Sequence, residues 1–151
     1  MIQRIECPQE RSRIAREILD KLPAWFGIPE SAAEYVRMCA ELPVWADFDG
    51  ERCTGFIAMR ATSQCAAEIH VMGVDPAYHR KGVGRRLFEA MRDEARRQGM
   101  KYLHVKTVRS GMYEEYDQTN CFYRSLGFEE LECLEELWDS QNPCQLYIMT
   151  L

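Results

Sequence analysis

The segment EIHVMGVDPAYHRKGVGRRLFEAM, residues 68–91, constrains the fold of this chain more than any other. It starts as a strand, passes an Asp-Pro step and a basic turn with two glycines, and continues as an amphipathic helix over 82–98. Gly82 and Gly84 let the backbone approach a ligand closely, and the unpaired N–H groups and positive dipole of a first helical turn attract anions. The segment therefore predicts a phosphate-binding turn between a strand and a helix.

Basic side chains surround this turn. Arg80, Lys81, Arg85 and Arg86 add positive charge where a pyrophosphate or a ribose 3′-phosphate would lie. Two other phosphate-binding motifs fail on spacing, because GxxxxGK[ST] is absent and GxGxxG would need glycine at Leu87. A tight turn with a solvated basic face is the structural alternative, and the combination of strand, basic turn and amphipathic helix favours phosphate binding.

Strands and helices alternate along the rest of the chain. Strands are expected at 1–7, on both sides of the Asp49-Gly50 turn, and at 66–74, 102–108, 128–136 and 145–151, and helices at 9–21, 30–41, 82–98 and 114–126. No linker or repeat divides them. This order predicts one α/β domain over residues 1–151, built around a single mixed sheet.

Composition excludes several classes of function. A formal net charge of -5 and a pI near 5.3 argue against a general nucleic-acid binder, which needs Lys and Arg to neutralise phosphates. The seven cysteines form no CxxC pair and the three histidines no HxxH or HExxH spacing, so we expect reduced thiols and no metal. No apolar run approaches the roughly 20 residues of a membrane span, and the N-terminus has charges where a secretory signal is apolar. We therefore expect a cytoplasmic protein with no membrane partner.

Two motifs resemble the GNAT superfamily of N-acetyltransferases. The run HRKGVG, residues 79–84, resembles its coenzyme A loop, [QR]-x-x-G-x-[GA], although His79 replaces the usual Gln or Arg. The run TNCFYRSLGF, residues 119–128, is similar to its FYxxxGF signature. The resemblance covers about residues 2–151 and implies a mixed, mostly antiparallel sheet of about seven strands with about four flanking helices. It also implies that the chain is an acyltransferase with acetyl-CoA as co-substrate.

The resemblance also implies which residues contact the cofactor. The backbone of the strand segment 72–74 would stabilise the carbonyl oxygen of the thioester as it becomes anionic. Tyr116 takes the place of an Asn that many members carry. The residues assigned to the cofactor are Met72, Gly73, Val74, His79, Arg80, Lys81, Gly82, Val83, Gly84, Arg85 and Tyr116.

Catalysis by direct attack needs a base for the amine and an acid for the leaving thiolate. Tyr123 matches the general acid of the family, and a phenol is protonated at neutral pH. Glu68 matches the glutamate of the protein-acetylating branch. Regular alternation would place Glu68, His70 and Met72 on one face and Ile69 and Val71 on the other.

Two candidates therefore compete for the general base. Glu68 would lie about 13 Å along the strand from Met72 and would need an intervening water. His70 is closer, and an imidazole has an ordinary pKa near 6.5. Each also fits a structural role: Glu68 as the ion-pair partner of an arginine on a neighbouring strand, and His70 as a hydrogen-bonded sheet histidine.

The acceptor is expected to bind between the N-terminal helices and the C-terminal strands. The candidate acceptor residues are Trp25, Phe26, Trp45, Trp138 and Asn142, with Asp139 beside them. Glutamates crowd residues 129–136, and an acidic rim favours a cationic amine, although a solvated charge run also explains them. No extended polar groove is visible in the sequence, so we expect the primary amine of a small molecule.

Three other functions stay open. A protein or peptide N-acetyltransferase would use the same chemistry, a non-catalytic acyl-CoA-binding module would keep the fold and cofactor, and a nucleotide-binding regulator would bind ATP or NAD. The apolar C-terminal strands are compatible with a homodimer.

Overall fold

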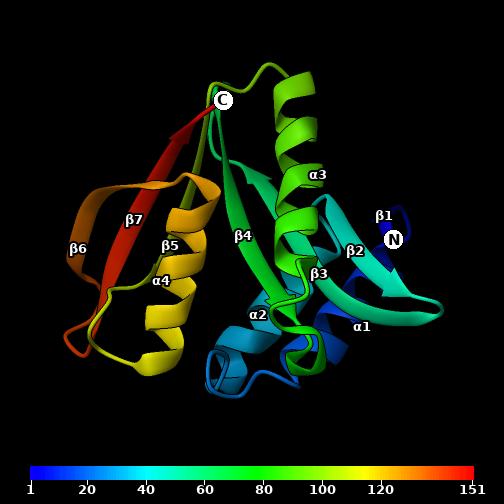
Figure 1. The fold of residues 1–151 in the computed structure, drawn as a ribbon, viewed down its shortest axis with the longest axis horizontal. Helices are drawn as coiled ribbons and strands as arrows, with labels where there is room; N and C mark the ends of the chain where they lie inside the picture. The colour runs from blue at the N-terminus through cyan, green and yellow to red at the C-terminus, as the bar shows by residue number, and fades with distance from the viewer.

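The computed structural model describes residues 1–151 and contains a single sheet of strand order β1-β2-β3-β4-β5-β7-β6 (Figure 1). The strands are β1 (Ile2–Ile5), β2 (Val44–Asp49), β3 (Arg52–Ala61), β4 (Ala66–Val74), β5 (Tyr102–Val108), β6 (Glu129–Asp139) and β7 (Asn142–Thr150). The helices are α1 (Pro8–Leu19), α2 (Pro29–Cys39), α3 (Val83–Arg97) and α4 (Glu114–Leu126), with a 3-10 turn at Pro76–Tyr78. All neighbouring strands are antiparallel except β4 and β5, so the prediction of a mixed, mostly antiparallel sheet is confirmed.

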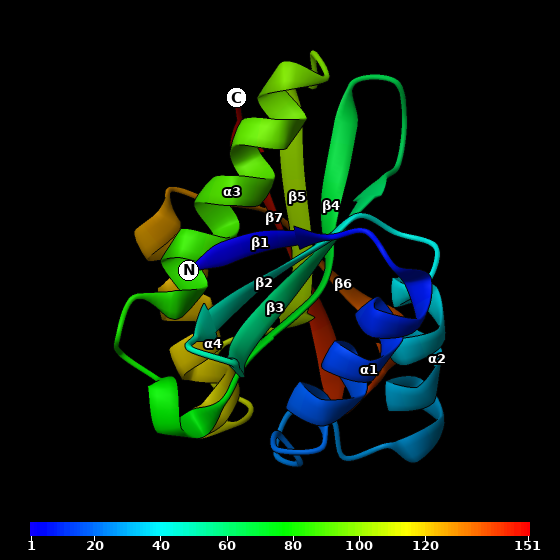
Figure 2. The ribbon, with the colours of Figure 1, turned by 90° about the vertical axis from the view of Figure 1, so that its right-hand side faces the viewer.

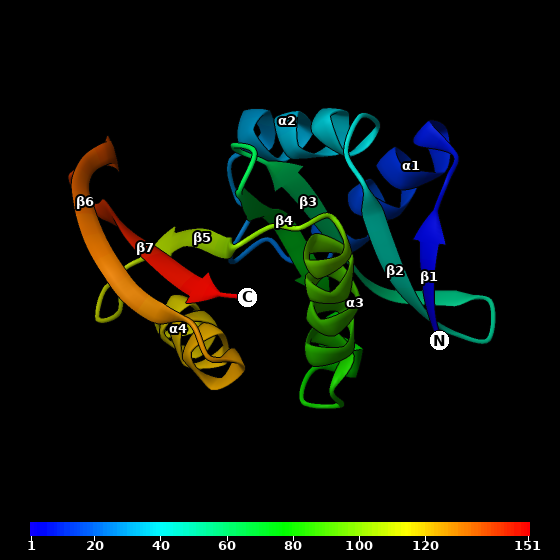
Figure 3. The same cartoon turned by 90° about the horizontal axis from the view of Figure 1, so that it is seen from above.

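The helices cover both faces of the sheet. Helices α1 and α2 lie on one face and α3 and α4 on the other (Figures 2 and 3). Apolar side chains spaced at helical intervals, such as Ile14 and Ile18 of α1 and Leu87 and Met91 of α3, are fully buried against the strands. The sheet thus separates two cores. None of the helices combines the length and apolar character that spanning a membrane requires.

Strands β4 and β5 pair along only a short stretch. Residues 66–68 pair with 102–104, and beyond Glu68 and His104 the two parallel strands diverge. Figure 1 shows the gap that widens between them. The divergence leaves one edge of β4 without a strand partner and opens the interior of the sheet.

A β-bulge in β4 overturns one prediction. Ala58 of β3 pairs with Val71 and Met59 pairs with Ile69, so His70 is the extra residue. As a result, Ile69 packs in the core beneath α3 and Val71 packs in the core beneath α1 and α2. The expectation that Ile69 and Val71 share a face is wrong, because regular alternation ends at the bulge. For the same reason Met72, expected on the face of His70, packs in the core beneath α3 with Ile69.

The hairpin of β6 and β7 is longer than the sequence predicts. Its turn is held by the Asp139 carboxylate, which accepts hydrogen bonds from the backbone N–H of Gln141 and from the Asn142 side chain, each 2.9 Å long. The run of glutamates in β6 hides any alternation of apolar and polar residues. Trp138 and Asn142 consequently lie at the end of the hairpin.

Asn120 ties α4 to the second half of the sheet. Its fully buried side chain donates hydrogen bonds to the carbonyl oxygens of Val108 (2.8 Å) and Tyr116 (2.7 Å). Its Oδ1 accepts a bond of 2.5 Å from the hydroxyl of Tyr147 in β7. One amide therefore joins α4, β5 and β7.

Replacing Asn120 with Ala should lower the free energy of unfolding by about 2–4 kcal/mol, because the Val108 carbonyl and the Tyr147 hydroxyl lose a buried partner. Tyr147→Phe removes a single bond and should cost about 1–2 kcal/mol. Urea denaturation followed by circular dichroism measures both values. Glu51→Ala, at an exposed residue, is the control and should stay within about 0.5 kcal/mol of wild type. A similarly small effect for Asn120→Ala would contradict the assignment.

Candidate functional site

A cleft of about 920 Å³ occupies the gap between β4 and β5. Its walls are residues 69–74 of β4, residues 105–108 of β5, the start of α3, one face of α4, the loop between α1 and α2, and the end of the β6–β7 hairpin. Most of the predicted site residues line it: Trp25, Phe26, His70, Met72, Gly73, Val74, His79, Arg80, Gly82, Val83, Gly84, Arg85, Tyr116, Tyr123, Trp138 and Asn142. Glu68, Lys81 and Trp45 do not.

The predicted phosphate turn, residues 79–84, lies at one end of this cleft. Gly82 caps the N-terminus of α3 with φ +78°, a left-handed conformation that suits glycine. Gly84 has a different reason to be glycine, because a Cβ there would lie 2.9 Å from Cζ of Phe122. The turn thus places the N-terminus of α3 beside α4, at the mouth of the cleft.

The basic side chains of the turn divide into two groups. Arg80 and Arg85 line the cleft. Lys81 points elsewhere, with Nζ 5.0 Å from the ring centroid of Tyr78, and Arg86 donates a 2.8 Å hydrogen bond to the buried carboxylate of Asp47. Two of the four cations are therefore available to an anion in the cleft.

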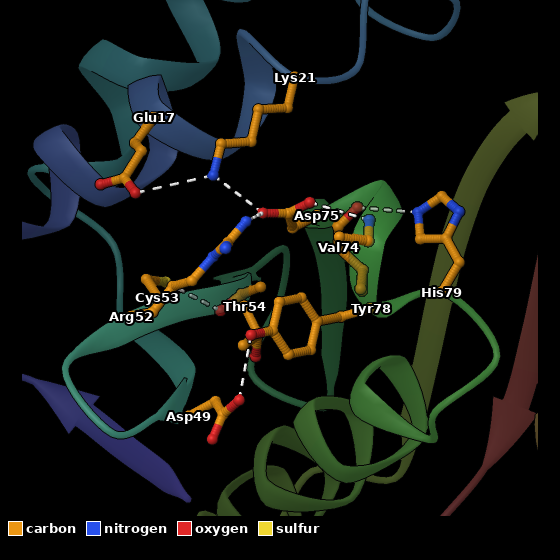
Figure 4. Close-up of polar contacts among 12 residues, drawn as sticks. Glu17, Lys21, Asp49, Arg52, Cys53, Thr54, Val74, Asp75, Tyr78 and His79 are labelled. Carbon is orange, nitrogen blue, oxygen red and sulfur yellow. Dashed lines mark hydrogen bonds and ion pairs between the residues drawn. The ribbon is translucent and has the colours of Figure 1, made fainter.

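Asp75, at the end of β4, anchors the turn (Figure 4). Its Oδ2 accepts hydrogen bonds of 2.9 Å from Lys21, just after α1, and from Arg52 of β3, and its Oδ1 accepts one of 2.9 Å from the backbone N–H of Ala77. Burial alone would raise the pKa of Asp75, but these bonds outweigh it and hold that pKa well below its usual range. The carboxylate joins three segments that are distant in sequence.

Further contacts hold the two ends of the turn. The Tyr78 hydroxyl donates a 3.0 Å hydrogen bond to Asp49, and the Arg52 guanidinium lies 5.3 Å from the Tyr78 ring centroid. Nε2 of His79 lies 2.8 Å from the Val74 carbonyl oxygen, which makes Nε2 the protonated nitrogen. Lys21 and Arg52 could not be predicted from the sequence, because nothing local marks their contact with a residue far along the chain.

The loop between α1 and α2 crosses the cleft to α4. Nε1 of Trp25 donates to the Glu115 carbonyl oxygen at 3.2 Å and lies 3.1 Å from Oγ1 of Thr119, and the Tyr116 hydroxyl donates to the Trp25 carbonyl oxygen at 2.8 Å. The Trp25 ring also packs edge-on against His79. Trp25, predicted at the acceptor side, thus lies beside the phosphate turn. Burial raises the pKa of Tyr116 to about 12, so its hydroxyl stays protonated.

His70 projects from the bulge into the cleft, and both of its ring nitrogens are buried without a hydrogen-bond partner. The ring of Tyr35, from α2, packs edge-on against it with centroids 5.5 Å apart, and Phe26 packs against Tyr35 at 5.8 Å. Tyr35 could not be predicted as a site residue from the sequence, because within α2 its spacing resembles that of a core residue. Trp45 is buried in the core beneath α3, with the Arg4 guanidinium 5.7 Å from its ring, and so lies away from the acceptor side.

Glu68 lies behind His70, at the point where β4 and β5 part. It is 7% exposed, and its Oε2 accepts a 2.7 Å hydrogen bond from Lys106 of β5. Burial alone would raise the pKa of Glu68, but the contacts with His70 and Lys106 outweigh it and lower that pKa to about 2. The carboxylate is therefore ionised, paired and outside the cleft, which makes it a weak base.

Tyr123 occupies the inner face of α4. Its ring packs against Phe128 and Tyr147, with centroids 5.9 and 6.1 Å away, and it lines the cleft. Burial raises the pKa of Tyr123 well above the usual range of a phenol. The group is thus held in its protonated form.

Comparison with known proteins identifies the family. Residues 40–130 match the model of the acetyltransferase (GNAT) domain. The N-alpha-acetyltransferase RimI of Mycobacterium tuberculosis is 42% identical over 64 residues, which are 42% of this chain and 35% of that protein. The chain thus matches about a third of the length of that relative.

Solved structures share the fold over almost the whole chain. A GNAT-family acetyltransferase from Desulfovibrio desulfuricans superposes with a TM-score of 0.87 at 17% identity, covering 99% of this chain and 98% of the other. An aminoglycoside 6'-N-acetyltransferase in complex with coenzyme A superposes with a TM-score of 0.76 at 19% identity, covering 99% and 96%. At these identities the likeness concerns the fold alone.

Replacing Asp75 with Asn should lower the free energy of unfolding at pH 7 by about 1–3 kcal/mol, a modest cost because Lys21 and Arg52 are partly exposed. The folded-state pKa lies below the ordinary value of 3.8, so this stabilisation is complete above that pH and disappears as the pH falls through the folded-state pKa. Urea denaturation at stepped pH should give a constant difference from pH 6 to 8 and a smaller one below about pH 4. Asp20→Asn, at the exposed end of α1, is the control. A difference that persists unchanged to pH 3 would contradict the role of the charge.

Proposed function

The chain belongs to the GNAT acetyltransferase family, and we propose that it moves the acetyl group of acetyl-CoA to the primary amine of a small, positively charged molecule. Acetyl-CoA-dependent acetyl transfer is the general activity of this family, which makes the chain an acyltransferase. The observation that carries the proposal is the continuous cleft, which joins the phosphate turn to His70 and Tyr123.

The phosphate turn would bind the diphosphate of coenzyme A. Backbone N–H groups at the start of α3 would donate to its oxygens, and Arg80 and Arg85 would balance its charge. Beyond Glu68 the edge of β4 that faces β5 has no strand partner, so the main chain of 72–74 has hydrogen bonds to offer the thioester oxygen.

The residues of the cleft suggest how the protons move. The neutral amine attacks the thioester carbon, its proton passes to His70, the C–S bond breaks, and Tyr123 gives its proton to the departing sulfur. We prefer His70 to Glu68 as the base because its side chain lines the cleft and its nitrogens have no hydrogen-bond partner, whereas the Glu68 carboxylate is paired with Lys106.

The acceptor end of the cleft favours a compact cation. Phe26, Tyr35 and Trp138 supply aromatic walls that suit an ammonium group, and Asp139 places a carboxylate at the end of the hairpin. A protein N-terminus is the second candidate, favoured by the similarity of 64 residues to an N-alpha-acetyltransferase.

Release of free thiol from acetyl-CoA, measured with polyamines, aminoglycosides, amino acids and short peptides, tests the reaction and the acceptor class together. His70→Gln and Tyr123→Phe should each lower kcat by about 100-fold or more while the Kd for acetyl-CoA, from calorimetry, changes less than about 3-fold. Because the Tyr123 phenol stays protonated, the rate should show no loss of this acid up to about pH 10. Wild-type protein that binds acetyl-CoA and releases no thiol with any amine would favour the binding-module alternative. Absence of coenzyme A binding would overturn the whole proposal.

The charge of the acceptor can be tested separately. Asp139→Asn should raise the KM for a polyamine by about 2–5-fold with kcat unchanged, and raising the salt concentration should have the same effect on wild type. Glu129→Gln, on the same strand but outside the cleft, is the matched control. A KM that is constant across the salt series would exclude an electrostatic contribution to acceptor binding.

A further inference from the structure

Four ionisable side chains meet where β4 and β5 part: Glu68 and His70 from β4, and His104 and Lys106 from β5. Glu68 and His104 are opposite each other in the last paired position of the two strands. The side chains of Glu68, His70 and His104 are 10%, 12% and 18% exposed. Burying ionisable groups is costly unless they are paired, so the arrangement of their partners is informative.

The two oxygens of the Glu68 carboxylate have different neighbours. Oε2 lies 2.7 Å from Nζ of Lys106 and 3.5 Å from Nδ1 of His104. His104 is held in turn by its other nitrogen, which lies 2.7 Å from Oγ1 of Thr62. Oε1 faces only Nδ1 of His70, at 3.8 Å. The partners on β5 therefore occupy one oxygen and leave the other for His70.

His70 is the member of the cluster whose side chain makes no hydrogen bond. A neutral imidazole has one N–H donor and one lone pair, and both nitrogens of His70 are buried without partners. A shift of less than 1 Å would let Nδ1–H donate to Oε1 of Glu68. That bond would fix the tautomer in which Nε2 carries the lone pair, leaving this nitrogen as the acceptor for a proton that arrives through the cleft.

We propose that Lys106 and His104 are positioning residues for acetyl transfer: they hold Oε2 of Glu68 so that Oε1 orients His70 with Nε2 free to take the proton of the amine. The inference rests on the proposed function, in which His70 is the base. The Lys106 ammonium also offsets the charge of Glu68.

Other groups around the cluster carry little charge near His70 at neutral pH. Burial, with a smaller effect of Glu68, raises the pKa of Tyr35, and burial raises that of Cys144 to about 11, so both stay neutral. Glu34 of α2 and Arg60 of β3 are exposed, where solvent screens them. Glu68 and Lys106 are thus the charged pair of the cluster at neutral pH.

The test is the titration of His70 in the full chain, followed by the ring nitrogen shifts of ¹⁵N-labelled protein without substrate. In wild type the neutral ring should be protonated at Nδ1. Lys106→Met removes the offsetting charge and should move the titration midpoint up by about 0.5–1 pH unit, while Glu68→Gln should move it down by at least as much and mix the tautomers. Lys106→Arg should restore the wild-type midpoint, and Lys101→Met, an exposed lysine just before β5, should leave it unchanged.

Lys106→Met leaves a buried carboxylate unpaired and can unfold the chain, so the double variant Glu68→Gln/Lys106→Met gives a second measurement. It removes both charges, and its midpoint should lie above that of Glu68→Gln alone. His104→Gln should mix the tautomers without moving the midpoint as far as Lys106→Met does.

Identical midpoints and tautomers in all variants would overturn the inference, even if His70→Gln abolishes turnover. Conversely, the expected shifts together with full turnover of His70→Gln would overturn the base role of His70 and leave the positioning of its ring established.

Discussion

The parting of β4 and β5 after three residue pairs is the constraint on which the rest of the structure depends. Parallel strands that stayed paired would satisfy each other's backbone groups and fill the centre of the sheet. Because they diverge, a cleft reaches the middle of the domain. The main chain of β4 lines this cleft, and its backbone groups on that edge have no strand partner. The helices that begin beside this gap, α3 and α4, turn it into a walled site.

Such a gap weakens the sheet, and the structure compensates by joining its halves with side chains. Lys106 reaches Glu68 at the inner end of the gap, and Trp25 reaches α4 at the outer end. Asn120 holds α4 to β5 and β7. These contacts are polar and directional, so they fix the width of the cleft, which apolar packing alone would leave adjustable.

Much of the fold could be predicted from the sequence, since periodicity and turn residues are local. The bounds of β4, β5 and α4 agree with the predicted ranges, and the Asp49-Gly50 turn joins β2 to β3 as expected. The phosphate turn could be found for the same reason, because its glycines and cations are contiguous. The partners of Asp75 could not be predicted from the sequence, because Lys21 and Arg52 come from other segments and only the folded chain brings them together. An ion pair was one of the roles expected for Glu68, but its partner Lys106 could not be named for the same physical reason.

Because of the bulge at His70, the face of the sheet to which a β4 side chain points depends on the number of residues between it and the bulge. On one side of the bulge odd-numbered side chains face α3, and on the other side even-numbered ones do. Deleting His70 would restore regular alternation, but deleting a residue elsewhere in β4 with the bulge kept would force the residues beyond the deletion to exchange their faces. If the C-terminal half exchanged, Met72 or Val74 would turn toward α1, where even a Cβ on Gly73 would lie 2.8 Å from Leu22. A substitution in this strand therefore changes the size or charge of one side chain. A deletion outside the bulge changes which side chains of the strand face each of the two cores.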